Sequence, residues 1–240
     1  MDFLYGIAPV HQALLANKRS LKRLWVKPGK PSPKLQELLR AAQKAGMKAE
    51  TADLNFIANK VKGKNHQGVL LECGNLPTLD LQDWVDSLGP EARLLMLDQI
   101  EDPQNVGGML RTAAFLGMNA ALMLRSKSSP LTPTVSKASA GAMESFPIIQ
   151  VTNLAEAIRF LQSNEFFIYG ADLSAESVDY RSVDPSSRAG LVMGNEGSGL
   201  RSLTQKRCDQ LVEIPRQGPM ESLNVGVAAG LLMAHFTRRP

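Results

Sequence analysis

Residues 105–113, NVGGMLRTA, place an amide and a guanidinium within two helical turns of each other. Asn105 can donate and accept hydrogen bonds, and Arg111 can bind a phosphate or carboxylate through two parallel N–H bonds. The apolar residues recur with a helical period, which predicts a helix with Asn105 at or before its start. Asn105 could serve there only as a cap, with Gly107 and Gly108 allowing close packing. The alternative is a polar site at the helix N-terminus.

A second candidate loop, MGNEGSGL at residues 193–200, follows a predicted strand and carries one acid, Glu196. Its glycines do not follow the order G-x-G-x-x-G, and it lacks the lysine of a P-loop. Glu213 lies near the distance at which a dinucleotide site has its acid, so a nicotinamide site stays open. Because Glu196 would repel a phosphate, the loop better suits a ligand that offers amine or hydroxyl donors.

A third loop lies within IPRQGPMESLNVGVAAG, residues 214–230, and leads through a Gly-Pro turn into a helix predicted from about Leu223. Ser222 could serve only as the N-cap of this helix, which is the alternative to a role in a site. All three loops follow strands of one predicted sheet, so we expect their polar side chains to converge at one edge. The candidate site combines Asn105, Arg111, Glu196, Ser222 and Asn224.

The elements that must position these loops alternate between strand and helix. The predicted strands are 93–98, 120–124, 147–151, 166–171, 190–194 and 210–214, and the predicted helices are 105–116, 135–140, 154–162 and the last from about 223. Such alternation predicts an α/β domain with a mostly parallel sheet and helices on both faces. Ligands of such sheets bind beyond the carboxyl ends of the strands.

A smaller αβαβαβ unit is predicted to precede this sheet. Its helices are expected at 7–16, 35–45 and 56–61, and its strands at 21–26, near 47 and at 66–72. Proline and glycine then surround one short helix, which is typical of a linker. The predicted division is a small domain over residues 1–75, a linker over 76–90 and a second domain over 91–240.

The two predicted domains differ in charge. Residues 1–75 carry 13 Lys and Arg against 5 Asp and Glu, a balance of +8, whereas the remainder carries 14 against 18, a balance of −4. The asymmetry indicates that the first domain approaches a polyanion such as RNA. A lysine-rich surface that is merely solvated is the alternative.

Several classes of protein are not indicated. The longest apolar run, 225–236, is too short to span a membrane, and the N-terminus lacks the pattern of a signal peptide, so we expect a cytoplasmic protein. Cys73 and Cys208 stand far apart and are expected to be buried free thiols. No histidine or cysteine has the spacing of a metal site, and no metal is predicted.

The motifs DPQNVGGMLRTA, LVMGNEGSGL and IPRQGPMESLNVGVAAG resemble the three signature motifs of the SpoU class of the SPOUT superfamily, and the likeness covers the whole second domain. The first domain, with FLYGIAPVHQALL, LKRLWV and KNHQGVLLE, is similar to the L30-like substrate domain of the bacterial enzymes that modify a guanosine of 23S ribosomal RNA. The resemblance implies a ribose 2′-O-methyltransferase that uses S-adenosylmethionine. It also implies a C-terminal trefoil knot and a homodimer with the site near the subunit interface; neither a membrane nor DNA is implied as a partner.

The resemblance also implies roles for particular residues. Arg111 would lie closest to the chemistry, either as general base or as a bidentate ligand of the RNA phosphate and of the forming 2′-oxyanion. Asn105 would orient Arg111 or the ribose, Glu196 would hold Arg111 or Asn105, and Asn224 would support the third motif. Gly194, Ile214 and Leu223 match the family's cofactor-binding positions. Gly226 departs from the family pattern, which usually continues with serine there.

Three other functions are open to the sequence. A transfer-RNA ribose methyltransferase would share all three loops, although the first domain argues against it. A non-catalytic RNA-binding or ribosome-assembly protein would fit the basic first domain, but it would not need Asn105, Arg111, Glu196 and Asn224. A nucleotide-dependent oxidoreductase would be distinguished by binding a nicotinamide in place of S-adenosylmethionine.

Overall fold

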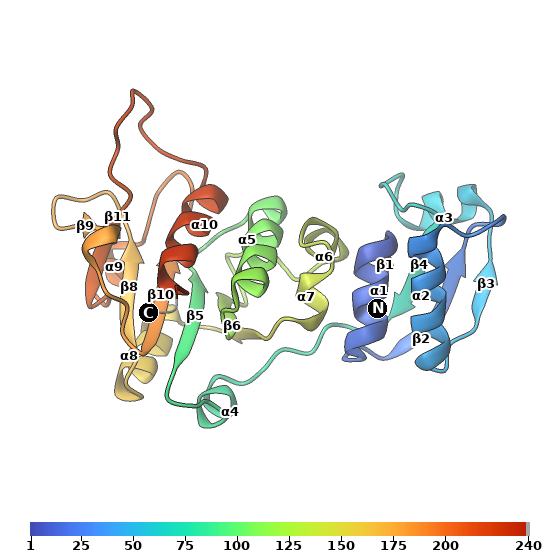
Figure 1. The fold of residues 1–240 in the computed structure, drawn as a ribbon, viewed down its shortest axis with the longest axis horizontal. Helices are drawn as coiled ribbons and strands as arrows, with labels where there is room; N and C mark the ends of the chain where they lie inside the picture. Colours follow the sequence, from blue (N-terminus) through green and yellow to red (C-terminus); the bar gives the residue numbers. More distant parts are fainter. Residues whose placement is uncertain (239–240) are drawn as a thin grey trace. The chain divides into compact units, whose positions relative to one another are not determined.

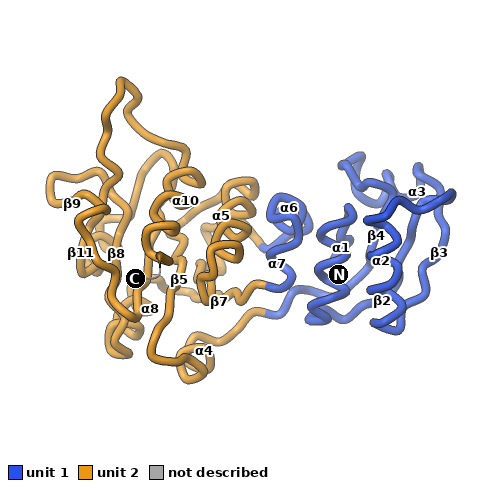
Figure 2. The backbone as a smooth tube through the Cα atoms, in the orientation of Figure 1, with its two compact units in different colours: residues 1–77, 131–145 blue, residues 78–130, 146–240 orange. Residues whose placement is uncertain are grey.

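The structure, a computed structural model, describes residues 1–238 and divides into two compact units. Figure 2 colours unit 1, which comprises residues 1–77 and 131–145, and unit 2, which comprises 78–130 and the residues from 146 onward. The predicted division differs in two places. Residues 131–145, expected in the second domain, pack with unit 1, and residues 78–90, expected as a linker, belong to unit 2.

Unit 1 is a four-stranded sheet in the order β1-β4-β2-β3, with β1 and β2 antiparallel to β4 and β3 parallel to β2. Its elements are β1 (Asp2–Tyr5), α1 (Ile7–Ala16), β2 (Leu21–Val26), α2 (Pro33–Lys44), β3 (Ala49–Thr51), α3 (Leu54–Lys60), β4 (Val69–Cys73), α6 (Pro133–Ala138) and α7 (Ala142–Ser145). The sequence analysis did not predict β1, because four residues are too few to show the alternation of a strand. The other predicted elements of the unit are confirmed.

The segment 131–145 is fixed to unit 1 by close packing and by a buried ion pair. Gly141 has φ +89°, and a Cβ there would lie 2.8 Å from the carbonyl oxygen of Ala8 in α1. Arg19, 3% exposed, donates to Glu144 across 2.6 Å and to Asp2 across 2.6 Å, and Ser136 donates to Glu144 across 2.7 Å. Each buried charge thus has an opposite charge and further hydrogen bonds, without which its desolvation would be costly.

Unit 2 is a seven-stranded sheet in the order β7-β6-β5-β10-β8-β11-β9, and all its strand pairs are parallel (Figure 1). Its elements are α4 (Leu81–Asp86), β5 (Ala92–Leu97), α5 (Pro103–Leu116), β6 (Ala120–Leu124), β7 (Ile148–Val151), α8 (Leu154–Ser163), β8 (Phe167–Ala171), β9 (Val178–Asp179), the 3-10 turn η1 (Tyr180–Ser182), β10 (Arg188–Met193), α9 (Ser202–Gln205), β11 (Gln210–Glu213) and α10 (Val225–Phe236). The predicted parallel sheet is confirmed; the short elements β9 and η1 were not predicted.

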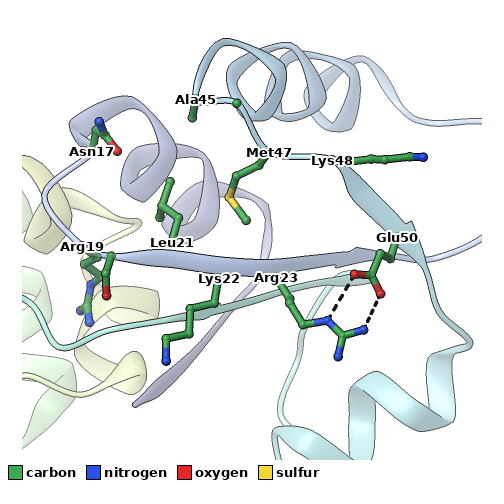
Figure 3. A pocket seen from close by; sticks show the side chains of 11 residues that line it. Asn17, Arg19, Leu21, Lys22, Arg23, Ala45, Met47, Lys48 and Glu50 are labelled. Atoms are coloured by element: carbon green, nitrogen blue, oxygen red, sulfur yellow. Dashed lines mark hydrogen bonds and ion pairs between the residues drawn. The ribbon is translucent and has the colours of Figure 1, made fainter.

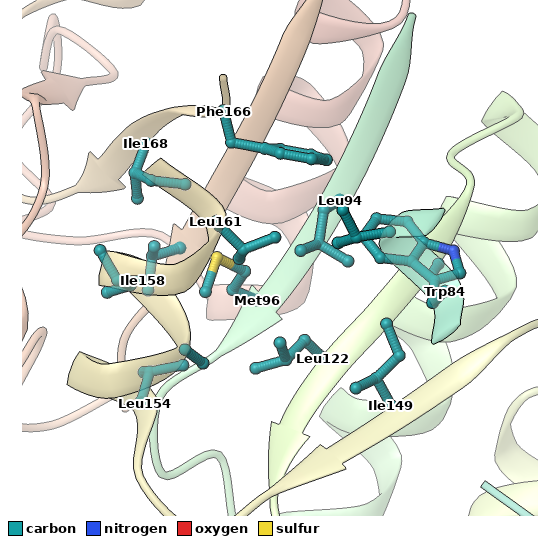
Figure 4. Packing of buried hydrophobic residues seen from close by; sticks show 14 of the residues in the cluster. Trp84, Leu94, Met96, Leu122, Ile149, Leu154, Ile158, Leu161, Phe166 and Ile168 are labelled. Atoms are coloured by element: carbon teal, nitrogen blue, oxygen red, sulfur yellow. The ribbon is translucent and has the colours of Figure 1, made fainter. Parts of the chain in front are cut away.

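Helices cover both faces of this sheet, as predicted. On one face α4 and α8 bury Trp84, Ile158 and Leu161 against strand residues such as Leu94 and Met96 (Figure 4). Side chains alternate along a strand, so the intervening residues point to the opposite face, where α5 and α10 pack on each other. There the ring of Tyr169 in β8 lies 4.8 Å from the ring of Phe236 in α10. The predicted trefoil knot stays a prediction.

Neither cysteine is placed for chemistry. Cys73 is buried in unit 1, as expected, but Cys208 is only partly buried. Burial raises the pKa of Cys73 to about 11 and that of Cys208 to about 12, so both thiols keep their protons at neutral pH. Among the described residues, no helix is both long and apolar enough to cross a bilayer.

The ion pair between Arg19 and Glu144 predicts an unequal response to two similar substitutions. Glu144→Gln removes the buried charge that compensates Arg19, so we expect the free energy of unfolding to fall by about 3 kcal/mol. The control is Glu50→Gln, because Glu50 pairs with Arg23 on the surface, where the side chains are 45% and 57% exposed. Urea unfolding measures the free energy of unfolding of both variants. Equal decreases would contradict a larger contribution from the buried ion pair.

Candidate active site

The predicted loops leave the carboxyl ends of strands in one parallel sheet. β5 and β10 are neighbours, and the chain continues from β5 to β6 on one side and from β10 to β11 on the other. Such a reversal of direction opens a crevice beyond the strand ends, where ligands of open α/β sheets bind. The first and second loops leave at this point, and the third leaves β11 on the same edge.

Three side chains, one from each loop, are joined by hydrogen bonds; we call them the amide–carboxylate triangle. The Asn105 amide donates to Glu196 Oε2 across 3.1 Å, and the Asn224 amide donates to Asn105 Oδ1 across 3.1 Å and to Glu196 Oε1 across 3.3 Å. Glu196 thus accepts from both asparagines, which fixes the amide orientations. The predicted convergence of these three residues therefore occurs, and Glu196 holds Asn105 rather than Arg111.

The helix caps differ from the expectation. α5 begins at Pro103, and Asp102 caps it by accepting from the backbone N–H groups of Gln104 and Asn105. Asn105 therefore lies in the first turn, and its side chain is free to join the triangle. α10 is capped by Asn224, whose Oδ1 accepts from the next turn, so the alternative of a cap at Ser222 is wrong. Asn224 therefore both caps α10 and belongs to the triangle. Ser222 does neither.

The second loop is held in place by residues that the sequence did not single out. Asp98, 1% exposed at the end of β5, accepts from the Arg201 side chain across 2.7 Å and from the Thr204 hydroxyl across 2.7 Å. Asn195 donates to the carbonyl oxygen of Gln99 across 3.0 Å. In the sequence, Asp98 is recognisable only as a single acid at the end of an apolar strand. That pattern does not indicate its partners Arg201 and Thr204, about a hundred residues later.

A cavity of about 580 Å³ opens beside the triangle, at the carboxyl ends of β8, β10 and β11. Gly194, Ile214 and Leu223 all line it, and so does Glu196, which places the triangle at its rim. Its volume lies in the range of small-molecule sites. Apolar side chains form much of its wall, while Asp172, Glu196 and Glu213 add carboxylates that could accept from hydroxyl or amino groups of a ligand.

Gly194 is needed by the loop itself. A Cβ at this position would collide with the backbone of Gly199 and Leu200, because the loop closes on itself through paired hydrogen bonds between Asn195 and Gly199. The sequence interpretation, that glycine here leaves room for a ligand, is therefore only part of the reason. A larger residue would first disturb the loop that shapes the cavity.

Arg111 stands apart from the triangle. It is exposed on α5 and forms no hydrogen bond or ion pair with any residue in the range 1–238. It lies six residues beyond Asn105, so the two side chains leave different faces of the helix. The same helical face carries Phe115, one turn further on. The structure shows no hydrogen bond between Asn105 and Arg111, and the expectation that Asn105 orients Arg111 or the ribose stays a prediction.

Gly226, the departure from the family motif, lies in the first turn of α10. Its N–H donates to Asn224 Oδ1 across 2.9 Å, and a Cβ there would lie 3.2 Å from that oxygen and 3.8 Å from Asn105 Oδ1. A serine at this position would therefore be tight but would point toward the triangle. The triangle forms without it.

These contacts predict different effects of two glycine substitutions in the cavity wall. Gly194→Ala should lower the free energy of unfolding by about 2 to 4 kcal/mol, because rigid backbone must move. Gly218→Ala is the matched control, since a Cβ at Gly218 meets no atom within 4 Å, and its effect should stay within about 0.5 kcal/mol. Urea unfolding gives both values; a neutral Gly194→Ala would show that the loop can relax.

The chain matches two families. The SpoU rRNA methylase family matches residues 92–234, and the RNA 2′-O ribose methyltransferase substrate-binding family matches residues 3–79. A 23S rRNA (guanosine-2′-O-)-methyltransferase, RlmB, of Neisseria meningitidis serogroup B is 40% identical over 237 residues, which cover 98% of this chain and 94% of the relative.

Solved structures give the same fold. The AdoMet-bound rRNA methyltransferase from Sinorhizobium meliloti has a TM-score of 0.80 and 25% identity, covering 98% of this chain and 85% of that one. A structure described as giving insights into the 2-OH methylation of C/U34 on tRNA has a TM-score of 0.53 and 27% sequence identity. The match covers only 62% of this chain and 95% of that chain. With a family match over more than half its length and a relative this similar across nearly all of it, the chain belongs to the SpoU rRNA methylase family.

Proposed function

We propose that this protein transfers a methyl group from S-adenosylmethionine to the ribose 2′-OH of a guanosine in 23S ribosomal RNA. The observation that carries the proposal is the amide–carboxylate triangle at the rim of the cavity, where hydrogen-bonding groups stand beside a space for a small molecule. The substrate assignment rests on relatives of that name that match nearly the whole of this chain. A tRNA substrate is less well supported, because the tRNA enzyme matches only 62% of this chain.

The cavity suits the adenosyl part of the cofactor. Ile214 and Leu223 supply apolar walls for a purine, while the Gly194 loop presents backbone groups that could bind its edge. When bound there, S-adenosylmethionine supplies an activated methyl group on a sulfonium. The protein's task is to hold the ribose hydroxyl in line with that methyl group, which is mainly a matter of position.

The triangle would position the ribose. Asn105 is already oriented by Glu196 and Asn224, so its binding to a ribose would cost little reorganisation. Glu196 has both oxygens engaged by amides, which leaves it suited to a structural role or to one further hydroxyl donor. Asn224 both caps α10 and supports the third loop.

Arg111 would act on the RNA. A guanidinium keeps its proton at neutral pH, so we favour bidentate binding of the adjacent phosphate and stabilisation of the developing 2′-oxyanion over proton abstraction. Arg111 and Phe115 share one helical face of α5, so Arg111 would lie at the edge of a homodimer that forms through this face.

The homodimer is proposed to form through α5 and α10. Phe115 on α5 is 88% exposed, and Val227 and Leu231 on α10 are 54% and 44% exposed. α10 is apolar on almost every side, and such a helix is normally buried all round. A second copy of the chain would cover this face and bring Arg111 to the edge of the interface. Action on ribosomal RNA also accords with a cytoplasmic location.

Arg111 provides the test of the proposed function. With 23S rRNA transcript and saturating S-adenosylmethionine, the wild-type protein should methylate one guanosine ribose, while a tRNA transcript should not react. Arg111→Ala and Arg111→Lys should both slow single-turnover transfer about 100-fold or more, because lysine lacks the planar fork. Calorimetry should show unchanged cofactor affinity in both variants.

Three results would count against these assignments. Near wild-type transfer by Arg111→Lys would exclude the bidentate role, and near wild-type transfer by Arg111→Ala would remove Arg111 from the mechanism. Wild-type protein that binds S-adenosylmethionine but methylates only tRNA would move the substrate to the alternative class.

The proposed dimer predicts that a charge placed on the α5–α10 face separates the subunits. Phe115→Asp and Leu231→Asp should convert a dimer into a monomer at micromolar concentration, because burying an unpaired carboxylate costs several kcal/mol. Leu203→Asp on α9 is the control, since Leu203 is 56% exposed outside this face. Light scattering after size exclusion reports the mass; a wild-type monomer would refute the proposal.

A further inference from the structure

Three lysines of unit 1 gather around the loop that joins α3 to β4; we call them the lysine cluster. Lys64 lies in this loop and donates to the Thr134 hydroxyl across 2.6 Å, and Lys137 of α6 donates to Gln67 Oε1 across 2.8 Å. The aliphatic chain of Lys27 lies against Gly68, the neighbour of Gln67. Two segments far apart in the sequence, 62–68 and 133–138, thus bring cations to one place.

The ammonium groups of this cluster have no carboxylate partner among residues 1–238. The partners of Lys64 and Lys137 are a neutral hydroxyl and a neutral amide, so their charge is not compensated. Lys137 is also half-buried, and desolvation lowers its pKa from the usual value. A partly desolvated lysine without an acid is a favourable contact for an anion from outside.

The start of α1 adds to the positive potential. The N–H of Ile7, the first residue of this ten-residue helix, donates to the same Gln67 oxygen across 3.1 Å. Gln67 therefore links Lys137 to the helix N-terminus, where the unpaired N–H groups carry a partial positive charge. The neutral amide oxygen of Gln67 cannot balance both the Lys137 ammonium and the N-terminus of α1. This side of unit 1 therefore favours a negatively charged partner.

A second basic region, the groove in Figure 3, is a weaker candidate. It encloses about 560 Å³ and is lined by Lys22 and Lys48 as well as two arginines. Arg23 is already bound by Glu50, and Arg19 by Glu144 and Asp2. α1 and α2 both end at this groove, through their C-caps Asn17 and Ala45, and helix C-termini carry partial negative charge. The same helix, α1, thus favours an anion at the lysine cluster and disfavours it at the groove.

We propose that Lys27, Lys64 and Lys137 dock backbone phosphates of the RNA substrate. The inference rests on the proposed function, and it goes further by assigning the docking residues. Lys64 lies in the match to the substrate-binding family and Lys137 in the match to the methylase family, so the docking site combines both. The Arg19–Glu144 ion pair and the Gly141 contact hold the second segment in place for it.

The test compares two double variants that remove the same charge. Lys64→Met with Lys137→Met removes two cluster cations but keeps the apolar stems, and Lys22→Met with Lys48→Met does the same in the groove. Fluorescence anisotropy measures binding to a 23S rRNA transcript and to an unrelated RNA of about 20 nucleotides, over about 50 to 300 mM salt. Urea unfolding and cofactor titration establish that each variant is folded.

The cluster variant should bind both RNAs about 10-fold more weakly at about 150 mM salt, and its log–log salt slope should fall by roughly one to two. The groove variant should change affinity less than about 2-fold. Equal losses in both variants, or a larger loss in the groove variant, would overturn the assignment. Because the unrelated RNA reports phosphate binding without methylation, failure of the docking site is distinguishable from failure of the proposed methyl transfer.

Discussion

The amide–carboxylate triangle is the interaction on which the site depends, because it joins three loops that are far apart in the sequence. Asn105 and Glu196 are 91 residues apart, and Asn105 and Asn224 are 119 apart. A parallel sheet makes the meeting possible, since the strands deliver their carboxyl ends to one edge. Each amide is then oriented by a partner, and Glu196 brings the triangle to the wall of the cavity.

Within each unit, a buried acid joins segments that are far apart in the sequence. Asp98 fixes the second loop through Arg201 and Thr204, and Glu144 fixes the segment 131–145 to unit 1 through Arg19. Both acids are 1% exposed, and their partners offset the desolvation cost of burying them. A cut after residue 75 would remove Arg19 and leave Glu144 uncompensated. The substrate-binding unit and the methylase unit are therefore separate as compact bodies but not as stretches of sequence.

The arrangement also separates the two tasks of an RNA methyltransferase. Unit 1 carries the excess of positive charge, and its uncompensated lysines are available to a phosphate backbone. Unit 2 carries the cavity, the triangle and an exposed apolar face on α5 and α10. Binding energy from phosphates positions the substrate but does not by itself select a nucleotide.

The sequence by itself determined the order of most strands and helices, the three loops and the residues of the triangle, because hydrophobic period and turn residues are local signals. The resemblance to the SpoU motifs indicated Gly194, Ile214 and Leu223 together, and all three line one cavity. Only the tertiary structure decided that Asp102 and Asn224 are the caps, that Gly194 is required by its own loop and that 131–145 packs on α1. The physical reason is distance along the chain: Arg19 and Glu144 are 125 residues apart, and no local pattern specifies which buried charge meets which.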